Sequence, residues 1–201
     1  MINGIVISGC SGVGKTTVIK HLLRLHPDFA FSVSYTTRPP RADEVDGKDY
    51  HFISREEFER KARERFFLEW EEVYGCYYGT PKLPPDEEEG TTRVVIFELD
   101  SKGALNLQQK FPQFTTIAII PPSVDAIGAR LRARGSETDE SIAERRRHIA
   151  EELRRLQHLS YCVVNDDIEA TAREIETIIL AQFHRLPFLG AKIDELLELL
   201  A

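Results

Sequence analysis

The segment from residue 9 to residue 16 constrains this chain more than any other. It reads Gly-Cys-Ser-Gly-Val-Gly-Lys-Thr and follows the apolar run at 5–7, which is the spacing and setting of a phosphate-binding P-loop. Backbone N–H groups at the start of a helix converge there on a nucleotide phosphate. Lys15 adds positive charge, and the Thr16 hydroxyl is a ligand for Mg²⁺. The alternative is an ordinary glycine-rich turn, but the helical pattern of Val18, Leu22 and Leu25 favours a nucleoside triphosphate site.

Length and composition predict one globular domain. The chain has 201 residues, of which 42% are hydrophobic and 29% charged. No apolar run reaches the roughly 20 residues that cross a bilayer, and no signal-peptide pattern opens the chain, so we expect a cytoplasmic protein without a membrane partner. A net charge of −7 argues against broad nucleic-acid binding. The three cysteines are far apart, which suits reduced thiols and neither disulfides nor zinc.

Cys10 lies inside the P-loop and allows two opposite expectations. If its sulfur faces the loop, the N–H dipoles and Lys15 lower the pKa of the thiol and make it reactive toward maleimides. If its sulfur is buried against the preceding strand, the thiol is unreactive. We expect Cys162, which lies in an apolar strand, to be inert.

Apolar runs alternate with amphipathic stretches along the chain. This order predicts an α/β fold of the P-loop NTPase type, with three layers and a mostly parallel, five-stranded sheet. We expect strands at 4–8, 31–35, 94–99, 115–120 and 161–164. We expect helices near 15–25, 102–110, 124–134, 139–158 and 169–184.

The alternation changes between residues 38 and 90. Segments 50–53 and 67–70 resemble short strands, and a capping box at Ser54 and Glu57 predicts the start of a helix between them. We interpret this region as an inserted subdomain. A polar segment at 84–90 connects it back to the core. Arg38 and Arg41 lie on a proline-stiffened loop of the insert. Guanidinium groups suit a phosphate monoester, although a solvated loop is the alternative.

These segments together resemble guanylate kinases from residue 5 to residue 183. The matching strings are the P-loop and residues 31–41, 44–52, 67–70, 77–81, 121–123, 134–138 and 163–167. The resemblance implies phosphoryl transfer from ATP to GMP and dGMP with Mg²⁺ as cofactor, in a monomer or homodimer. It implies one domain over 1–201: a core at 1–33 and 91–184, a GMP-binding insert at 34–90, a lid at about 130–145 and a C-terminal helical extension at 185–201.

Carried over to this chain, the resemblance assigns the GMP site. It places the phosphate at Arg38, Arg41, Tyr50 and Tyr78, and the base at Ser34, Glu69, Thr80 and Asp100. Guanine presents N–H donors beside the O6 acceptor, so carboxylates accept from it and hydroxyls donate to it. Adenine would leave these buried groups mispaired. The alternatives are a surface acid for Glu69 and a helix N-cap for Asp100, which also is a candidate near Mg²⁺.

The resemblance likewise assigns catalysis and ATP binding. It makes Lys15, Arg134 and Arg145 catalytic, because cations that arrive with a closing lid stabilise the transferring phosphoryl group. The expected ATP-binding residues are Gly9, Ser11, Gly12, Val13, Gly14, Lys15, Thr16, Thr17, Arg130 and Asn165. Asn165 is expected near the adenine of ATP. The alternative is that Asn165 is only a turn residue at the end of a strand.

Some segments depart from the guanylate kinase pattern. Lys102 stands where glutamine is common, so the surroundings of Asp100 are expected to differ. In the C-terminal extension, one helical face carries Ile193, Leu196, Leu197 and Leu200. We expect this face to pack on its own domain; a partner interface is the alternative. A catalytically inactive, phosphoprotein-binding relative remains a second function, but it predicts a damaged P-loop. A GTPase would require an Asn-Lys-x-Asp guanine reader, which we do not find.

Overall fold

The core is a five-stranded sheet in which every strand pair is parallel. The computed structural model describes residues 2–10, 12–41, 44–73, 75–82, 93–123, 126, 139–184 and 186–200. The strands are β1 (Ile2–Gly9), β2 (Ala30–Ser32), β7 (Arg93–Glu98), β8 (Thr115–Ile120) and β9 (Tyr161–Val164), in the order β2-β7-β1-β8-β9. The predicted α/β class is confirmed. Central strands buried on both faces require apolar runs of this kind.

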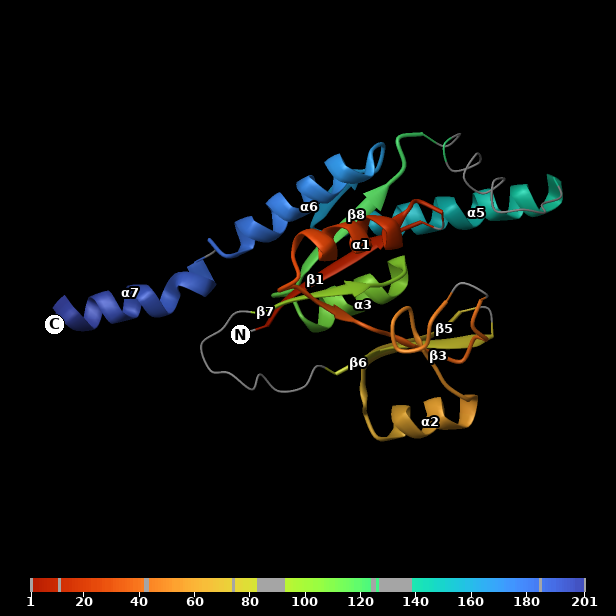
Figure 1. Cartoon of the computed structure of the whole chain (residues 1–201), viewed down its shortest axis with the longest axis horizontal. Coiled ribbons are helices and arrows are strands. Elements are labelled where there is room, and N and C mark those ends of the chain that lie inside the picture. The colour runs from red at the N-terminus through yellow and green to blue at the C-terminus, as the bar shows by residue number, and fades with distance from the viewer. Residues whose placement is uncertain are drawn as a thin grey trace.

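Helices cover both faces of this sheet (Figure 1). On one face, α1 (Lys15–Leu25) and α6 (Ile168–Gln182) pack against Ile5 and Ile7 of β1. On the other face, α3 (Ser101–Lys110) packs against Val6, because successive side chains of a strand point to opposite faces. Helix α5 (Asp139–Leu156) contacts α3. The helix expected at 124–134 lies outside the described residues apart from Ala126, as does the bridge at 84–90.

The insert forms a second sheet. It contains β3 (Tyr35–Thr36), β4 (His51–Phe52), β5 (Phe67–Val73) and β6 (Cys76–Pro81), in the order β4-β3-β6-β5. Helix α2 (Arg55–Arg63) begins at the predicted cap, where the Ser54 hydroxyl accepts from the Glu57 N–H at 3.1 Å. Phe58 of this helix stacks on Phe67 of β5, with ring centroids 4.5 Å apart.

The prediction of one strand at 31–35 is wrong. The chain leaves the core sheet after Ser32, which pairs with Phe97, and enters the insert sheet at Tyr35, which pairs with Gly79. The intervening residues, including Ser34, belong to neither sheet. Ser34 therefore marks the boundary between the core and the insert.

The C-terminal extension forms helix α7 (Leu186–Leu200), as its spacing predicts. The helix extends away from the body of the molecule and ends at the chain terminus (Figure 1). Ile193, Leu196 and Leu200 are exposed, the last to 85%. The expectation that this face packs on its own domain is therefore wrong for these side chains. Within the part of the chain that the structure describes, we find no helix with the length and apolar character to span a membrane.

Candidate active site

The P-loop connects β1 to α1, and two of its glycines are required by geometry. Gly14 has a φ of 97°, which is the left-handed region that side chains disfavour, and a Cβ there would lie 2.7 Å from Nδ2 of Asn165. A Cβ on Gly9 would lie 2.5 Å from the Ile119 carbonyl oxygen. Since that oxygen belongs to the backbone of β8, it cannot move aside. The described residues of the loop therefore show the close approaches that the glycines of the motif allow.

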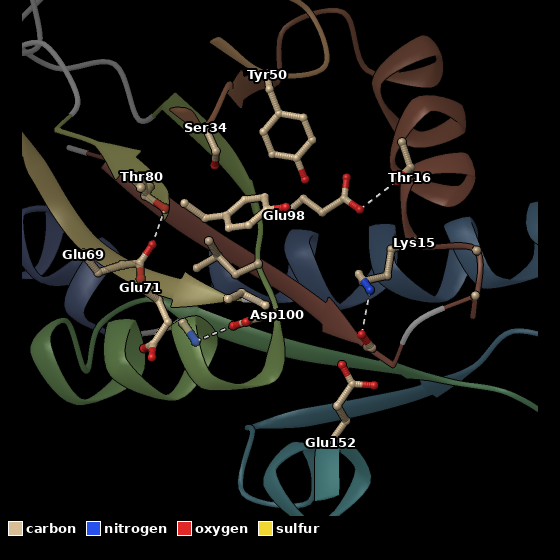
Figure 2. Close-up of a pocket in the computed structure, with 18 of the residues that line it drawn as sticks. Lys15, Thr16, Ser34, Tyr50, Glu69, Glu71, Thr80, Glu98, Asp100 and Glu152 are labelled. Carbon is tan, nitrogen blue, oxygen red and sulfur yellow. Dashed lines mark hydrogen bonds between the residues drawn. The ribbon is translucent and has the colours of Figure 1, made fainter. Parts of the chain in front are cut away.

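The Lys15 ammonium lies at the mouth of this loop. Its Nζ donates to the Gly9 carbonyl oxygen at 2.6 Å, and Figure 2 shows Lys15 and Thr16 on one side of the cavity with Glu69 and Thr80 on the other. The cavity has a volume of about 320 Å³. The expected ATP-binding residues Gly9, Gly12, Gly14, Lys15, Thr16 and Thr17 line it, together with Glu152 of α5, which the sequence analysis did not single out.

Thr16 is hydrogen-bonded to a carboxylate that the sequence analysis missed. The Thr16 hydroxyl donates to Oε1 of Glu98 at 2.7 Å. Glu98 ends β7, the strand beside β1, and an acidic residue at the carboxyl end of that strand was the available signal. Hydroxyl and carboxylate oxygens are hard ligands that suit Mg²⁺. Among the described residues there is no group of three or more His, Cys, Asp or Glu that could hold a metal, and Mg²⁺ in a nucleotide site does not require one.

Glu69 and Thr80 lie opposite each other on adjacent strands of the insert sheet. A β-bulge between Phe67 and Glu69 shifts the register so that Glu69 lies opposite Thr80. The Thr80 hydroxyl donates to Oε1 of Glu69 at 2.6 Å, and the Glu69 side chain is buried. Burial raises the pKa of Glu69 above its ordinary value, and the charge of Asp100 adds to this effect, while the Thr80 hydrogen bond opposes it.

Asp100 caps helix α3, as its alternative interpretation predicted. Its Oδ1 accepts from the N–H groups of Lys102 at 3.1 Å and Gly103 at 2.7 Å. A Cβ on Gly103 would lie 3.3 Å from both Oδ1 of Asp100 and Oε2 of Glu69, so the glycine allows both carboxylates to approach the first turn of the helix. Both line the cavity, at the end away from Lys15 (Figure 2). Of the two acids near the end of β7, Glu98 and not Asp100 contacts the Thr16 hydroxyl.

A second cavity of about 260 Å³ adjoins the first. Arg38, Arg41, Tyr50 and Tyr78, the four residues expected at the GMP phosphate, all line it. Burial raises the pKa of Tyr50 to about 12, so its hydroxyl stays protonated and remains a donor at neutral pH. Nη2 of Arg38 donates to both carboxylate oxygens of Glu44 at 2.7 and 2.9 Å, a partner that sequence reasoning also missed.

Asn165 is hydrogen-bonded to the backbone of the P-loop. It is 2% exposed, and its Nδ2 donates to the Val13 carbonyl oxygen at 2.6 Å. Its expected place near adenine stays a prediction. Ser11, Arg130 and Arg134 lie outside the described residues, and only the backbone of Arg145 is described, within α5.

Cys10 is completely buried. Burial raises the pKa of its thiol, and this effect outweighs the opposing charge of Lys15. The hypothesis of a reactive thiolate in the loop is therefore wrong, and the buried alternative is confirmed. Cys162 lies in β9 as expected. Partial burial raises the pKa of its thiol, but the residue is exposed, so its place in an apolar strand does not make the thiol inaccessible to reagents as the expectation of an inert cysteine assumed.

The geometry defines a class of protein. A parallel sheet delivers a P-loop and an acidic residue to the same end of a cavity, and an inserted sheet closes the opposite end with hydrogen-bonding groups and an arginine-lined second cavity. This is the architecture of a P-loop kinase that phosphorylates a small acceptor.

Comparison with known proteins specifies the family. The sequence model described as guanylate kinase matches residues 1–182. The chain is 46% identical over 180 residues to a guanylate kinase of Caldanaerobacter subterraneus subsp. tengcongensis, covering 89% of this chain and 86% of that protein. It is 44% identical over 199 residues to one of Clostridium perfringens, covering 96% and 92%. The crystal structure of guanylate kinase from Anaplasma phagocytophilum matches with a TM-score of 0.73 and 31% identity, over 90% of this chain and 85% of that one.

The chain belongs to the guanylate kinase family. Its activity class is that of an ATP:GMP phosphotransferase, a nucleoside monophosphate kinase. The resemblance noted from the sequence is thus confirmed.

Proposed function

We propose that GMP and dGMP bind between the insert and the core, with the base in the first cavity and the phosphate in the second. The observation that carries this proposal is the pairing of Glu69 with Thr80 opposite Asp100, at the end of a cavity whose other end is the P-loop. In this arrangement the carboxylates accept from N1–H and the 2-amino group of guanine, and Ser34 donates to O6. Thr80 also donates to O6, and for this its single hydroxyl hydrogen turns from Glu69 to the base when guanine binds. The recognised groups are the base and the phosphate, so the 2′-hydroxyl is not required.

The acceptor phosphate is held by cations and neutral donors. Arg38 is fixed by Glu44, and Arg41 is largely exposed, with a side chain that reaches solvent at the edge of both cavities. Tyr50 and Tyr78 add hydroxyl donors without further charge. A phosphate monoester accepts from all four groups, and the two arginines supply charge-assisted hydrogen bonds.

ATP lies along the P-loop in this proposal, with Lys15 at its phosphates. To reach them, the Lys15 ammonium exchanges its hydrogen bond with Gly9 for one with phosphate oxygens. Thr16 and Glu98 would hold Mg²⁺, which neutralises phosphate charge when it is bound. Arg134 and Arg145 complete the charge stabilisation from the lid, and Arg130 and Asn165 lie with ATP. The core, insert, lid and extension have the boundaries given above.

The cellular setting follows from the substrates. We propose that the enzyme acts in the cytoplasm as a monomer or homodimer, where ATP and GMP are both present, and that nucleic acid is not a ligand. Light scattering of the purified chain tests the oligomeric state.

An ADP-release assay tests the proposed roles. With ATP and Mg²⁺, GMP and dGMP should be phosphorylated, whereas AMP, CMP and UMP should be poor acceptors. Glu69→Gln should reduce the preference for GMP over AMP and leave the KM for ATP unchanged. Glu72→Gln is the matched control, because Glu72 lies on the same strand with an exposed side chain.

Lys15→Ala separates catalysis from binding. It should lower kcat by about a hundredfold or more, since it removes a cation from the developing charge. A chain that binds GMP in calorimetry but releases no ADP with any acceptor would support the inactive-relative alternative. Comparable kcat/KM values for AMP and GMP would contradict the base assignment.

A further inference from the structure

Two lysines of the core reach strand β5 of the insert on either side of Glu69. Nζ of Lys110, in the last turn of α3, donates to the Leu68 carbonyl oxygen at 3.2 Å. The ammonium of Lys102, in the first turn of the same helix, forms an ion pair with the Glu71 carboxylate. Glu71 lies two residues beyond Glu69, so both side chains project from the same face of the strand.

These contacts fall where β5 most needs support. Among the strands that the structure describes, β5 lies at the edge of the insert sheet and pairs with a neighbour on one side only. Leu68 is the extra residue of the bulge that places Glu69 opposite Thr80. Lys110 therefore binds the backbone of the bulge that directs the Glu69 side chain.

Lys102 also contacts the other carboxylate of the base site. Its backbone N–H donates to Oδ1 of Asp100 at 3.1 Å, while its side chain pairs with Glu71. A single residue thus contacts Asp100 of the core and the strand that carries Glu69 of the insert. Figure 2 shows Glu69, Glu71 and Asp100 gathered at this end of the cavity.

The charges explain why such contacts are required. Glu69, Glu71 and Asp100 bring three carboxylates to the junction of two separately folded sheets, and like charges at short range repel. Burial is the main cause of the raised pKa of Glu69; the charges of Asp100 and Glu71 raise it further, whereas the charge of Lys110 lowers it. The lysines offset a repulsion that would otherwise push the insert away from the core.

We propose that Lys102 and Lys110 are positioning residues for guanine recognition. By docking β5 on α3 they hold Glu69 at the spacing from Asp100 that the donor edge of guanine requires. Neither lysine touches the base. The inference rests on the proposed GMP site and specifies what sets its geometry.

The test uses single and double substitutions of the full chain. Lys102→Gln and Lys110→Gln should each raise the KM and the calorimetric Kd for GMP by about two- to fivefold, and together by about tenfold. This is the range expected for an exposed ion pair at Lys102 and an exposed hydrogen bond to a carbonyl group at Lys110. The kcat and the KM for ATP should stay at wild-type values. Lys102→Arg should restore GMP binding because it restores the charge.

Two comparisons isolate positioning from general effects. The ratio of kcat/KM for GMP to that for IMP, which lacks the 2-amino group, should fall in the double variant, because only a correctly placed pair of carboxylates reads that group. Arg60→Gln is the control: it also removes a cation from an exposed ion pair, with Glu64, but within α2 of the insert. Glu71→Gln breaks the Lys102 pair from the insert side without altering α3, but it also removes one of the three repelling carboxylates, so it should weaken GMP binding less than Lys102→Gln does.

Clear outcomes would overturn the proposal. GMP affinity at the wild-type value in the double variant, or an equal loss in Arg60→Gln, would show that the lysines do not position the site. An ATP KM that rises as much as the GMP KM would indicate general destabilisation. Calorimetry measures GMP binding without catalysis, so a wild-type chain that binds GMP but does not release ADP would refute the proposed activity and leave this test intact.

Discussion

Replacing Thr80 with valine should shift the pH dependence of GMP use. The Thr80 hydroxyl is fully buried and donates to Glu69 at 2.6 Å, and it opposes the rise in the pKa of Glu69 that burial causes. Valine has nearly the same shape and no donor. The ionised Glu69 carboxylate therefore loses a stabilising partner, and its pKa should rise further.

The size of the shift follows from the strength of that hydrogen bond. A hydrogen bond to a charged group contributes about 1.5–3 kcal/mol, so its loss should raise the pKa of Glu69 by an amount that corresponds to this free energy. The ionised carboxylate accepts through both of its oxygens, whereas the protonated form presents an O–H donor that mispairs with the N–H groups of guanine. The acidic limb of kcat/KM for GMP should move to higher pH by the same amount, because kcat/KM reports ionisations of the free enzyme.

The assay compares variants at each pH between about 5 and about 8, the range in which the GMP phosphate also titrates, with a pKa near 6. That titration is common to all variants and cancels in their ratio. Thr80→Ser keeps the hydroxyl and should behave like wild type. Thr116→Val is the control for loss of a buried hydroxyl, since Thr116 is equally buried but donates to Gln108 in the core. An acidic limb that stays in place in Thr80→Val would refute the reasoning.

Thermal unfolding of the free enzyme gives an independent check. The pKa of Glu69 is higher in the folded chain than in the unfolded chain, so proton binding favours the folded state. The resulting stability is fully present below the unfolded pKa and is lost as pH rises through the folded pKa. Thr80→Val raises the folded pKa further, and its deficit in Tm should be larger in mildly alkaline buffer than in mildly acidic buffer.

Three shorter predictions concern the P-loop. Glu98→Gln should raise the Mg²⁺ concentration for half-maximal rate by about tenfold, as a metal titration at fixed ATP would reveal, because it removes a charge beside Thr16. Gly14→Ala should lower the Tm and raise the KM for ATP, since its φ of 97° and a Cβ 2.7 Å from Asn165 force the loop to move. Cys10 should remain unmodified by maleimide in the folded protein, and mass spectrometry that finds it labelled at the rate of an exposed thiol would contradict its burial.

Locally encoded elements were predictable from the sequence. Helix α1 begins at Lys15 and ends at Leu25 as expected, because a P-loop fixes its start and an amphipathic pattern its length. Strand β8 has its predicted bounds, since a run rich in β-branched residues beside turn residues has few alternatives. The cap at Ser54 depends only on residues within one helical turn.

Pairings between distant segments could not be predicted in the same way. Strand β3 is two residues long and exists because Tyr35 pairs with Gly79 of β6, a partner far along the chain. Neither segment has a run of alternating residues long enough to identify a strand. The expected strand at 31–35 joined two sheets for this reason: large residues and small polar residues alternate through it without interruption, and only the positions of the partner strands reveal the break.

The residues of the candidate site also fall into two groups: those in a local motif, which could be predicted, and those with distant partners, which could not. Lys15 and Thr16 belong to a motif with fixed spacing, so their placement followed from the sequence. Glu98 acts through Thr16, which is distant in sequence, and Asn165 acts through the Val13 carbonyl group, which no side-chain pattern reveals. A single acidic or amide residue at the end of a strand has several uses, and only the fold decides among them.

The burial of Cys10 has a practical consequence for spectroscopy. With that thiol inside the core, the other two cysteines of the chain are left accessible: Cys76 is partly exposed at the start of β6, and Cys162 is exposed on β9. One lies on the insert and the other on the core. Thiol-directed spin labels or fluorophores can therefore be attached to the unaltered sequence, one on the insert and one on the core. The distance between them would follow any movement of the insert relative to the core as GMP is added, without an engineered cysteine.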